Sequence, residues 1–169
     1  MRIIVSKSKQ EKAYVVAYDG AFFNCVIGRE GMTDDKKEGD WCTPRGVFNI
    51  KQIFYRADRL EDFECSLPKQ PLKKEDGWDD DPQSPFYNTQ VLLPHAYSAE
   101  ELWREDELYD LILVLDYNQN PAIPGKGSAI FIHVSKEGME YTKGCVALKK
   151  ADLLALLSQI GPSTQVEIL

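Results

Sequence analysis

The chain has 169 residues, of which 43% are hydrophobic and 28% are charged. This composition is ordinary for a globular protein, and the length predicts one domain spanning residues 1–169 with a sizeable core. The net charge of −7 argues against nucleic acid or an anionic membrane surface as the main partner.

The N-terminal sequence MRIIVSKSKQ lacks the apolar core and cleavage site of a secretory signal. No apolar run approaches the ~20 residues that a membrane span requires. We therefore expect a cytoplasmic protein with no membrane partner. The four cysteines form no CxxC pair and no ligand pairs have zinc-site spacing, so we expect reduced thiols, no metal and no cofactor.

Short strands are predicted along most of the chain, because apolar residues alternate or form β-branched runs. These strands cover 2–6, 12–18, 21–28, 46–55, 111–117, 129–135 and 164–169. Asp19-Gly20 predicts a two-residue hairpin turn, in which both positions need positive φ.

Two helices are predicted among the strands. Ser98 and Glu101 form a capping box that opens a short helix near 98–109, and leucines at helical spacing predict a C-terminal helix near 149–160. The segment 59–85 is long, polar and rich in turn residues, which favours a mobile loop that covers a cleft. Its acidic stretch EDGWDDD lacks the spacing of a calcium loop.

His133 and Cys145 are the candidate reactive residues. His133 ends an apolar strand, and Cys145 follows Gly144, which allows the backbone to turn tightly beside the thiol. A thiol nucleophile needs a nearby base and donors aimed at the developing oxyanion. Two ordinary core residues are the alternative. His95, in a loop, competes with His133 for the role of base, although a substrate-contacting or exposed position suits it better.

Several stretches together resemble the L,D-transpeptidase catalytic (YkuD) domain family. IHVSKEGMEYTKGCVAL resembles the family signature, in which a strand ends in His and a loop leads to Ser/Thr-x-Gly-Cys. DWCTPRGVFNI and GSAIFIHV fit the same family, and ELWREDELYDLILVLDYNQNPAIPGKGSAIFIHV resembles a compact, leaderless subgroup. The resemblance covers nearly the whole chain.

The resemblance implies a mixed, mainly β, sandwich-like fold. It implies that Cys145 is the nucleophile, that His133 is the base and that the Val134 carbonyl orients the imidazole. The amides of Cys145 and Gly144 would bind the oxyanion, and Thr142 of the signature would contact substrate.

Four further residues are candidates for substrate binding. Arg45 lies in the Thr-Pro-Arg-Gly turn, where a guanidinium suits a carboxylate, although an exposed turn arginine is equally compatible. Trp103 and Arg104 lie on the first predicted helix, and Tyr87 follows the long loop. For Trp103 a core position is the alternative.

The substrate that the resemblance implies is a small peptidoglycan stem tetrapeptide, which loses its terminal D-alanine through a thioester on Cys145. Because we expect no export, we favour an L,D-carboxypeptidase that trims recycled fragments. An L,D-transpeptidase and a non-catalytic module that binds wall peptides are the alternatives. The oligomeric state stays open.

Overall fold

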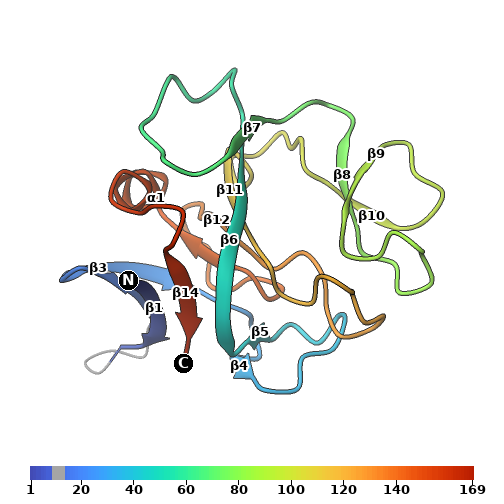
Figure 1. The fold of residues 1–169 in the computed structure, drawn as a ribbon, viewed down its shortest axis with the longest axis horizontal. Coiled ribbons are helices and arrows are strands. Elements are labelled where there is room, and N and C mark those ends of the chain that lie inside the picture. Colours follow the sequence, from blue (N-terminus) through green and yellow to red (C-terminus); the bar gives the residue numbers. More distant parts are fainter. Residues whose placement is uncertain (9–13) are drawn as a thin grey trace.

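The structure is a computed structural model that describes residues 1–8 and 14–169, and it is mainly β (Figure 1). The strands are β1 (Arg2–Lys7), β2 (Tyr14–Tyr18), β3 (Ala21–Val26), β4 (Met32–Thr33), β5 (Thr43–Pro44), β6 (Gly46–Tyr55), β7 (Lys69–Pro71), β8 (Asp76–Asp79), β9 (Gln90–Leu92), β10 (Ala99–Glu101), β11 (Leu111–Leu115), β12 (Phe131–Val134), β13 (Val146–Leu148) and β14 (Gln165–Ile168). One helix, α1 (Lys150–Leu157), lies within the described residues.

The largest sheet closes on itself. Its strand order is β11-β12-β13-β3-β2-β1-β14-β6-β7, and β6 also pairs with β11. This extra pairing joins the two sides of the sheet, which face each other across one interior as in a sandwich. A separate sheet, β10-β8-β9, lies on the far side of β6 and β11 from α1 (Figure 1).

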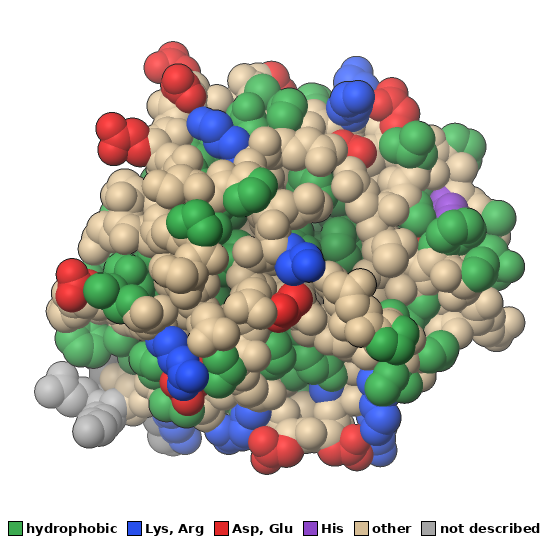
Figure 2. Space-filling model, viewed as in Figure 1, with side chains coloured by type: hydrophobic (Ala, Val, Ile, Leu, Met, Phe, Trp, Pro, Cys, Tyr) green, Lys and Arg blue, Asp and Glu red, His purple; other side chains and the backbone are tan. Residues whose placement is uncertain are grey.

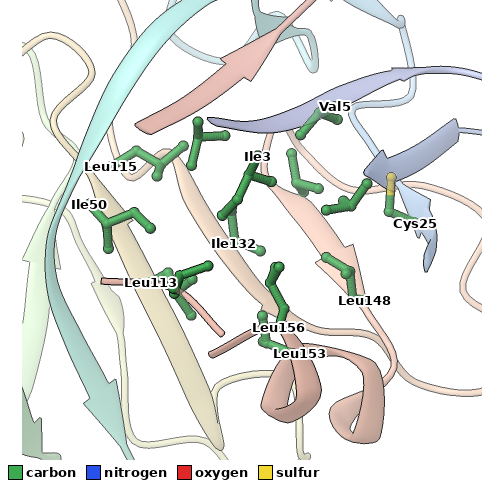
Figure 3. Close-up of a cluster of buried hydrophobic side chains, with 14 of the residues drawn as sticks. Ile3, Val5, Cys25, Ile50, Leu113, Leu115, Ile132, Leu148, Leu153 and Leu156 are labelled. Carbon is green, nitrogen blue, oxygen red and sulfur yellow. The ribbon is translucent and has the colours of Figure 1, made fainter. Parts of the chain in front are cut away.

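The interior of the closed sheet is the main core. On β11, Leu111, Leu113 and Leu115 point inward, because alternate residues of a strand face opposite sides. Leu153 and Leu156 of α1 point into the same cluster (Figure 3). No helix in the described part of the chain is long and apolar enough to cross a membrane.

A second core covers the outer face of the same strands. Ile112 and Val114 of β11 and Phe131 of β12 pack there against Trp78 of β8. The Trp78 and Phe131 rings meet edge to face, with centroids 5.1 Å apart. Burial on both faces explains why β11 is the continuous apolar run LILVL rather than an alternating one.

Most of the predicted elements are confirmed. The β2–β3 hairpin turns at Asp19 and Gly20, with φ of 46° and 82°. Strand β6 has the predicted bounds, and α1 lies within the predicted C-terminal helix. Lys12 and Ala13, at the start of one predicted strand, lie outside the described residues.

The predicted helix near 98–109 is wrong. Ala99–Glu101 forms β10 and pairs with β8, and the Leu102 N–H donates to the Asp76 carbonyl. The cross-strand hydrogen bonds satisfy the backbone while Leu102 and Tyr109 enter the second core. A short helix signal is outweighed by this burial, since local propensity is weak against tertiary packing.

The prediction of a polar loop over 59–85 is wrong where β7 and β8 form. The segment contains β7 and β8, and all four residues of β8, Asp76–Asp79, are buried. The Asp76 and Asp79 carboxylates accept hydrogen bonds, including those from Gln90 and Ser84. Acidic residues can enter a core when they are paired in this way, so the polar sequence EDGWDDD does not report exposure.

The sheet β8–β10 presents apolar side chains on its outer surface, visible at the right of Figure 2. The exposed members are Phe86, Leu92 and Tyr97. Phe86 and Tyr97 flank the His95 ring, with centroids 6.0 and 5.8 Å away. His95 is therefore part of a surface aromatic cluster on this sheet.

We expect Trp78→Ala to lower the free energy of unfolding by about 3–5 kcal/mol, because the indole is 4% exposed and fills the second core. Urea unfolding followed by circular dichroism measures the change. Phe86→Ala, at a side chain that is 54% exposed, is the control and should change stability little. If both variants changed the free energy of unfolding by the same small amount, the second core would not contribute to the stability of the fold.

Candidate active site

Strands β12 and β13 bring His133 and Cys145 to one edge of the closed sheet. The two strands are parallel, with His133 opposite Ala147 and Ile132 opposite Val146. Cys145 directly precedes β13, so it lies beside the start of β12. His133 shares the outer face with Phe131 because the two are two residues apart. His133 and Cys145 line the same cavity.

The loop before Cys145 is fixed by Thr142 and Gly144. The Thr142 hydroxyl donates to the Cys145 carbonyl (2.6 Å) and accepts from the Gly144 N–H (3.0 Å). Gly144 has φ of 140°, and a Cβ there would lie 2.8 Å from the Cys42 carbonyl oxygen. Only glycine fits this position, as the Gly-Cys pattern indicated.

The Cys145 thiol donates to the Ala129 carbonyl, with Sγ 3.1 Å from the oxygen. Ala129 has φ of 51°, in the left-handed region that residues other than glycine and asparagine seldom adopt. Its N–H donates to the Asn88 side-chain oxygen (3.0 Å). Asn88 therefore helps to hold the backbone that receives the thiol.

Asn88 is buried and uses all of its hydrogen-bonding capacity. Its oxygen also accepts from the Trp78 indole (2.9 Å), and its amide donates to the carbonyls of Tyr117 (3.0 Å) and Asn118 (2.8 Å). It links β8 to the segments before β12. Sequence analysis missed Asn88, because no motif marks it and its partners are distant in the chain.

His133 is oriented by backbone. Its Nδ1 lies 2.8 Å from the Val134 carbonyl oxygen, which can only accept, so Nδ1 carries the proton and Nε2 is left free to take one. The Tyr109 ring meets the imidazole edge to face at 5.3 Å. Burial lowers the pKa of His133 to about 4, against the opposing hydrogen bond to Val134.

The thiol is neutral for the same reason. Burial raises the pKa of Cys145 to about 12, and the Glu100 carboxylate raises it further. At neutral pH the site therefore holds a thiol beside an uncharged imidazole. Attack by Sγ would therefore require a base to take the thiol proton, because the resting thiol is not ionised.

The backbone donors beside the thiol differ from the sequence-based expectation. The Gly144 N–H is occupied by Thr142, so it does not point freely at a substrate oxygen. The Cys145 N–H has no hydrogen-bond partner in the part of the chain that the structure describes. The Cys145 amide is the better candidate for an oxyanion donor.

The cavity around Cys145 has a volume of about 840 Å³. It is lined by charged side chains of both signs: Lys36, Glu38, Asp80, Glu100, Arg104, Lys136, Glu140 and Lys143. The size is typical of a site for one small ligand, and the mixture of charges suits a ligand that also carries both signs.

The structure brings some of the candidate substrate residues to this cavity. Arg104 and Thr142 line it. The Arg104 guanidinium is bound bidentately to Asp106, with both distances 2.8 Å, so it faces the cavity with its charge partly compensated. Thr142 acts on the loop of Cys145 through its hydroxyl.

The other three candidates lie outside the cavity. Arg45 is exposed near Asp34, at 4.0 Å. Trp103 packs against the second core under the Arg56 guanidinium, 3.7 Å from the ring centroid. Tyr87 is buried, and its hydroxyl donates to Glu38 and accepts from the Gly127 N–H. Tyr87 thereby braces the segment before Ala129.

His95 lies away from the thiol. Its Nε2 is 2.7 Å from Asp79, a carboxylate that also accepts from Ser84, and it does not line the cavity. Asp80, Glu100 and Tyr109 do line it, and sequence analysis missed all three. Their signals were hidden by the incorrect loop and helix assignments.

The comparison with known families agrees with this geometry. The family model for the L,D-transpeptidase catalytic domain, YkuD, matches residues 1–168. No curated protein matches the chain. The match spans the whole closed sheet together with β8–β10 and the loop of Cys145. The chain belongs to the L,D-transpeptidase catalytic domain family, whose members use a cysteine for acyl transfer on peptidoglycan.

Proposed function

We propose that the protein is a cysteine-dependent L,D-carboxypeptidase that removes the terminal D-alanine from peptidoglycan stem tetrapeptides. The observation that carries the proposal is the single cavity that holds the Cys145 thiol and the His133 imidazole, with Nε2 free to take a proton. A module that only binds wall peptides has no need of this arrangement.

The reaction begins with proton transfer. Nε2 of His133 accepts the thiol proton as Sγ attacks the carbonyl carbon of the third residue, and the Cys145 N–H stabilises the oxyanion. The intermediate collapses, the C–N bond breaks, and the imidazolium gives its proton to the amine of D-alanine. A thioester to Cys145 remains.

Water completes the cycle. With His133 again as base, water attacks the thioester carbonyl, and the C–S bond breaks to release the tripeptide and regenerate the thiol. The size of the cavity supports water rather than a second peptide as the acceptor, because about 840 Å³ suits one ligand. The mixed charges of the lining support an amphoteric peptide as that ligand.

The proposal includes a cytoplasmic role in the recycling of wall fragments. Cys145 must stay reduced to act as a nucleophile, and the cytoplasm keeps thiols reduced. Soluble tetrapeptide fragments are also present there, so hydrolysis rather than crosslinking is the useful reaction.

Mass spectrometry of the products tests the function directly. Incubation with a disaccharide-tetrapeptide should release free alanine and leave the tripeptide, because water resolves the thioester. Crosslinked dimers as the main product would instead assign transpeptidation. Absence of any turnover by the wild-type protein, together with binding of the peptide, would favour a non-catalytic module.

We expect Cys145→Ala and Cys145→Ser to lower kcat/KM by roughly a thousandfold or more, because serine is a far weaker acid than cysteine. His133→Ala should be comparably damaging. His95→Ala is the matched control and should change kcat/KM only a few-fold, since His95 binds Asp79 outside the cavity. If His95→Ala matched His133→Ala, the base would have to be reassigned.

The neutral state of His133 is measurable by NMR in the His95→Gln variant, where His133 is the only histidine. Its imidazole signals should stay those of the neutral ring from pH 8 to pH 6, because burial places its pKa at about 4. A protonated ring at pH 7 would show a resting thiolate–imidazolium pair instead.

The same shift predicts how stability depends on pH. The pKa of His133 in the folded protein, about 4, lies below the ordinary value of 6.5. Between these two pH values His133 is protonated in the unfolded chain and neutral in the folded protein. The contribution of His133 to stability is therefore lost as the pH falls from 6.5 toward 4. His133→Gln should remove this part of the pH dependence in urea unfolding.

A further inference from the structure

Two carboxylates, Asp80 and Glu100, stand on the wall of the cavity that holds Cys145. Glu100 belongs to β10, and Asp80 directly follows β8. Glu100 is directly opposite Trp78 in the register, and Asp80 lies two residues after Trp78, so all three share one face of the sheet. That face is turned toward the second core and the cavity. We call Asp80 and Glu100 the carboxylate pair.

The Asp80 carboxylate lacks a partner among the residues that the structure describes. Its Oδ1 is buried and accepts no hydrogen bond from any described residue. No ion pair to Asp80 is formed in that part of the chain either. A buried oxygen without a donor destabilises the folded state, which is the pattern of a group kept for a ligand rather than for folding.

Glu100 also forms no ion pair with any residue that the structure describes. Its Oε1 accepts from the neutral Tyr109 hydroxyl at 2.7 Å. The nearby Arg104 guanidinium is bound bidentately to Asp106. Burial raises the pKa of Glu100, and the neighbouring Asp80 also raises it, while the Tyr109 hydrogen bond and the charges of Arg104 and Lys143 oppose the shift. A cation bound between the two carboxylates would offset the repulsion between them.

We infer that the carboxylate pair binds a side-chain ammonium on the third residue of the stem peptide. This residue is then a diamino acid, and its carbonyl carbon is the one that Cys145 attacks. The inference rests on the proposed function and names the group that the site recognises. An ammonium is a compact cation with three donors, which can satisfy Asp80 Oδ1 and a Glu100 oxygen together. Substrates with a neutral third side chain would leave the pair unpartnered.

The position of the pair also connects recognition to reactivity. The Glu100 carboxylate raises the pKa of the Cys145 thiol, so it opposes formation of the thiolate. An ammonium bound at the pair would offset this charge. The correct substrate therefore eases its own attack, in addition to being held more tightly.

Calorimetry with the Cys145→Ala protein tests the inference without turnover. Two tetrapeptides are compared that differ only at the third residue, which is lysine in one and ε-N-acetyllysine in the other. We expect the lysine peptide to bind roughly tenfold to a hundredfold more tightly, as for hydrogen bonds to charged groups. Asp80→Asn with Glu100→Gln should abolish this difference.

Glu101→Gln is the matched control, because Glu101 lies next to Glu100 on β10, is exposed and faces the opposite side. It should keep the full preference for lysine. Thermal unfolding should show no loss of stability in Asp80→Asn, since no hydrogen bond to that side chain is lost. A large loss would make Asp80 a structural residue and overturn its assignment.

The outcomes separate this inference from the proposed function. Equal binding of the two peptides, or a preference that survives in the double variant, would overturn the inference even if the wild-type protein releases alanine. A preference that the double variant loses would sustain it even if no alanine is released. The wild-type protein could instead prefer a free ammonium only in an added amine acceptor that resolves the thioester, and not in the third residue of the tetrapeptide. The carboxylate pair would then bind the acceptor, and the inference would be wrong.

Discussion

The burial of β11 and β12 on both faces is the constraint on which the rest of the structure depends. Their inner side chains fill the closed sheet, and their outer side chains, Ile112, Val114 and Phe131, need a second cover. The sheet β8–β10 supplies that cover through Trp78. The same cover forms a wall of the cavity, so the requirement for burial also places the active site.

Burial sets the resting charge of His133 and Cys145. The ordinary pKa values of histidine and cysteine are 6.5 and 9.0, and burial moves the pKa of His133 down and that of Cys145 up. Both groups rest uncharged, which spares the fold an isolated buried ion. Backbone carbonyls, rather than charged side chains, orient the two groups: Val134 accepts from the imidazole and Ala129 accepts from the thiol.

Asp80 is a site of local cost in the fold. Buried Asp79 is paired with Ser84 and His95, yet no described residue donates to the buried Oδ1 of Asp80. Natural proteins tolerate such local costs where a ligand completes the site. A wall that is needed for packing thus also carries the charges that would select a substrate.

The sequence by itself determined the strands with clear periodicity, the Asp19-Gly20 turn, α1 and the Gly144-Cys145 and His133 elements of the family signature, because these signals are local. The tertiary structure alone decided that 99–101 is a strand, that Asp76–Asp79 is buried, that Asn88 accepts from the Ala129 N–H, and that Asp80 and Glu100 line the cavity of Cys145. Each of these depends on hydrogen bonds and burial between segments that are distant in the chain. A pattern within a short window cannot contain such contacts, because the partners that decide them lie outside it.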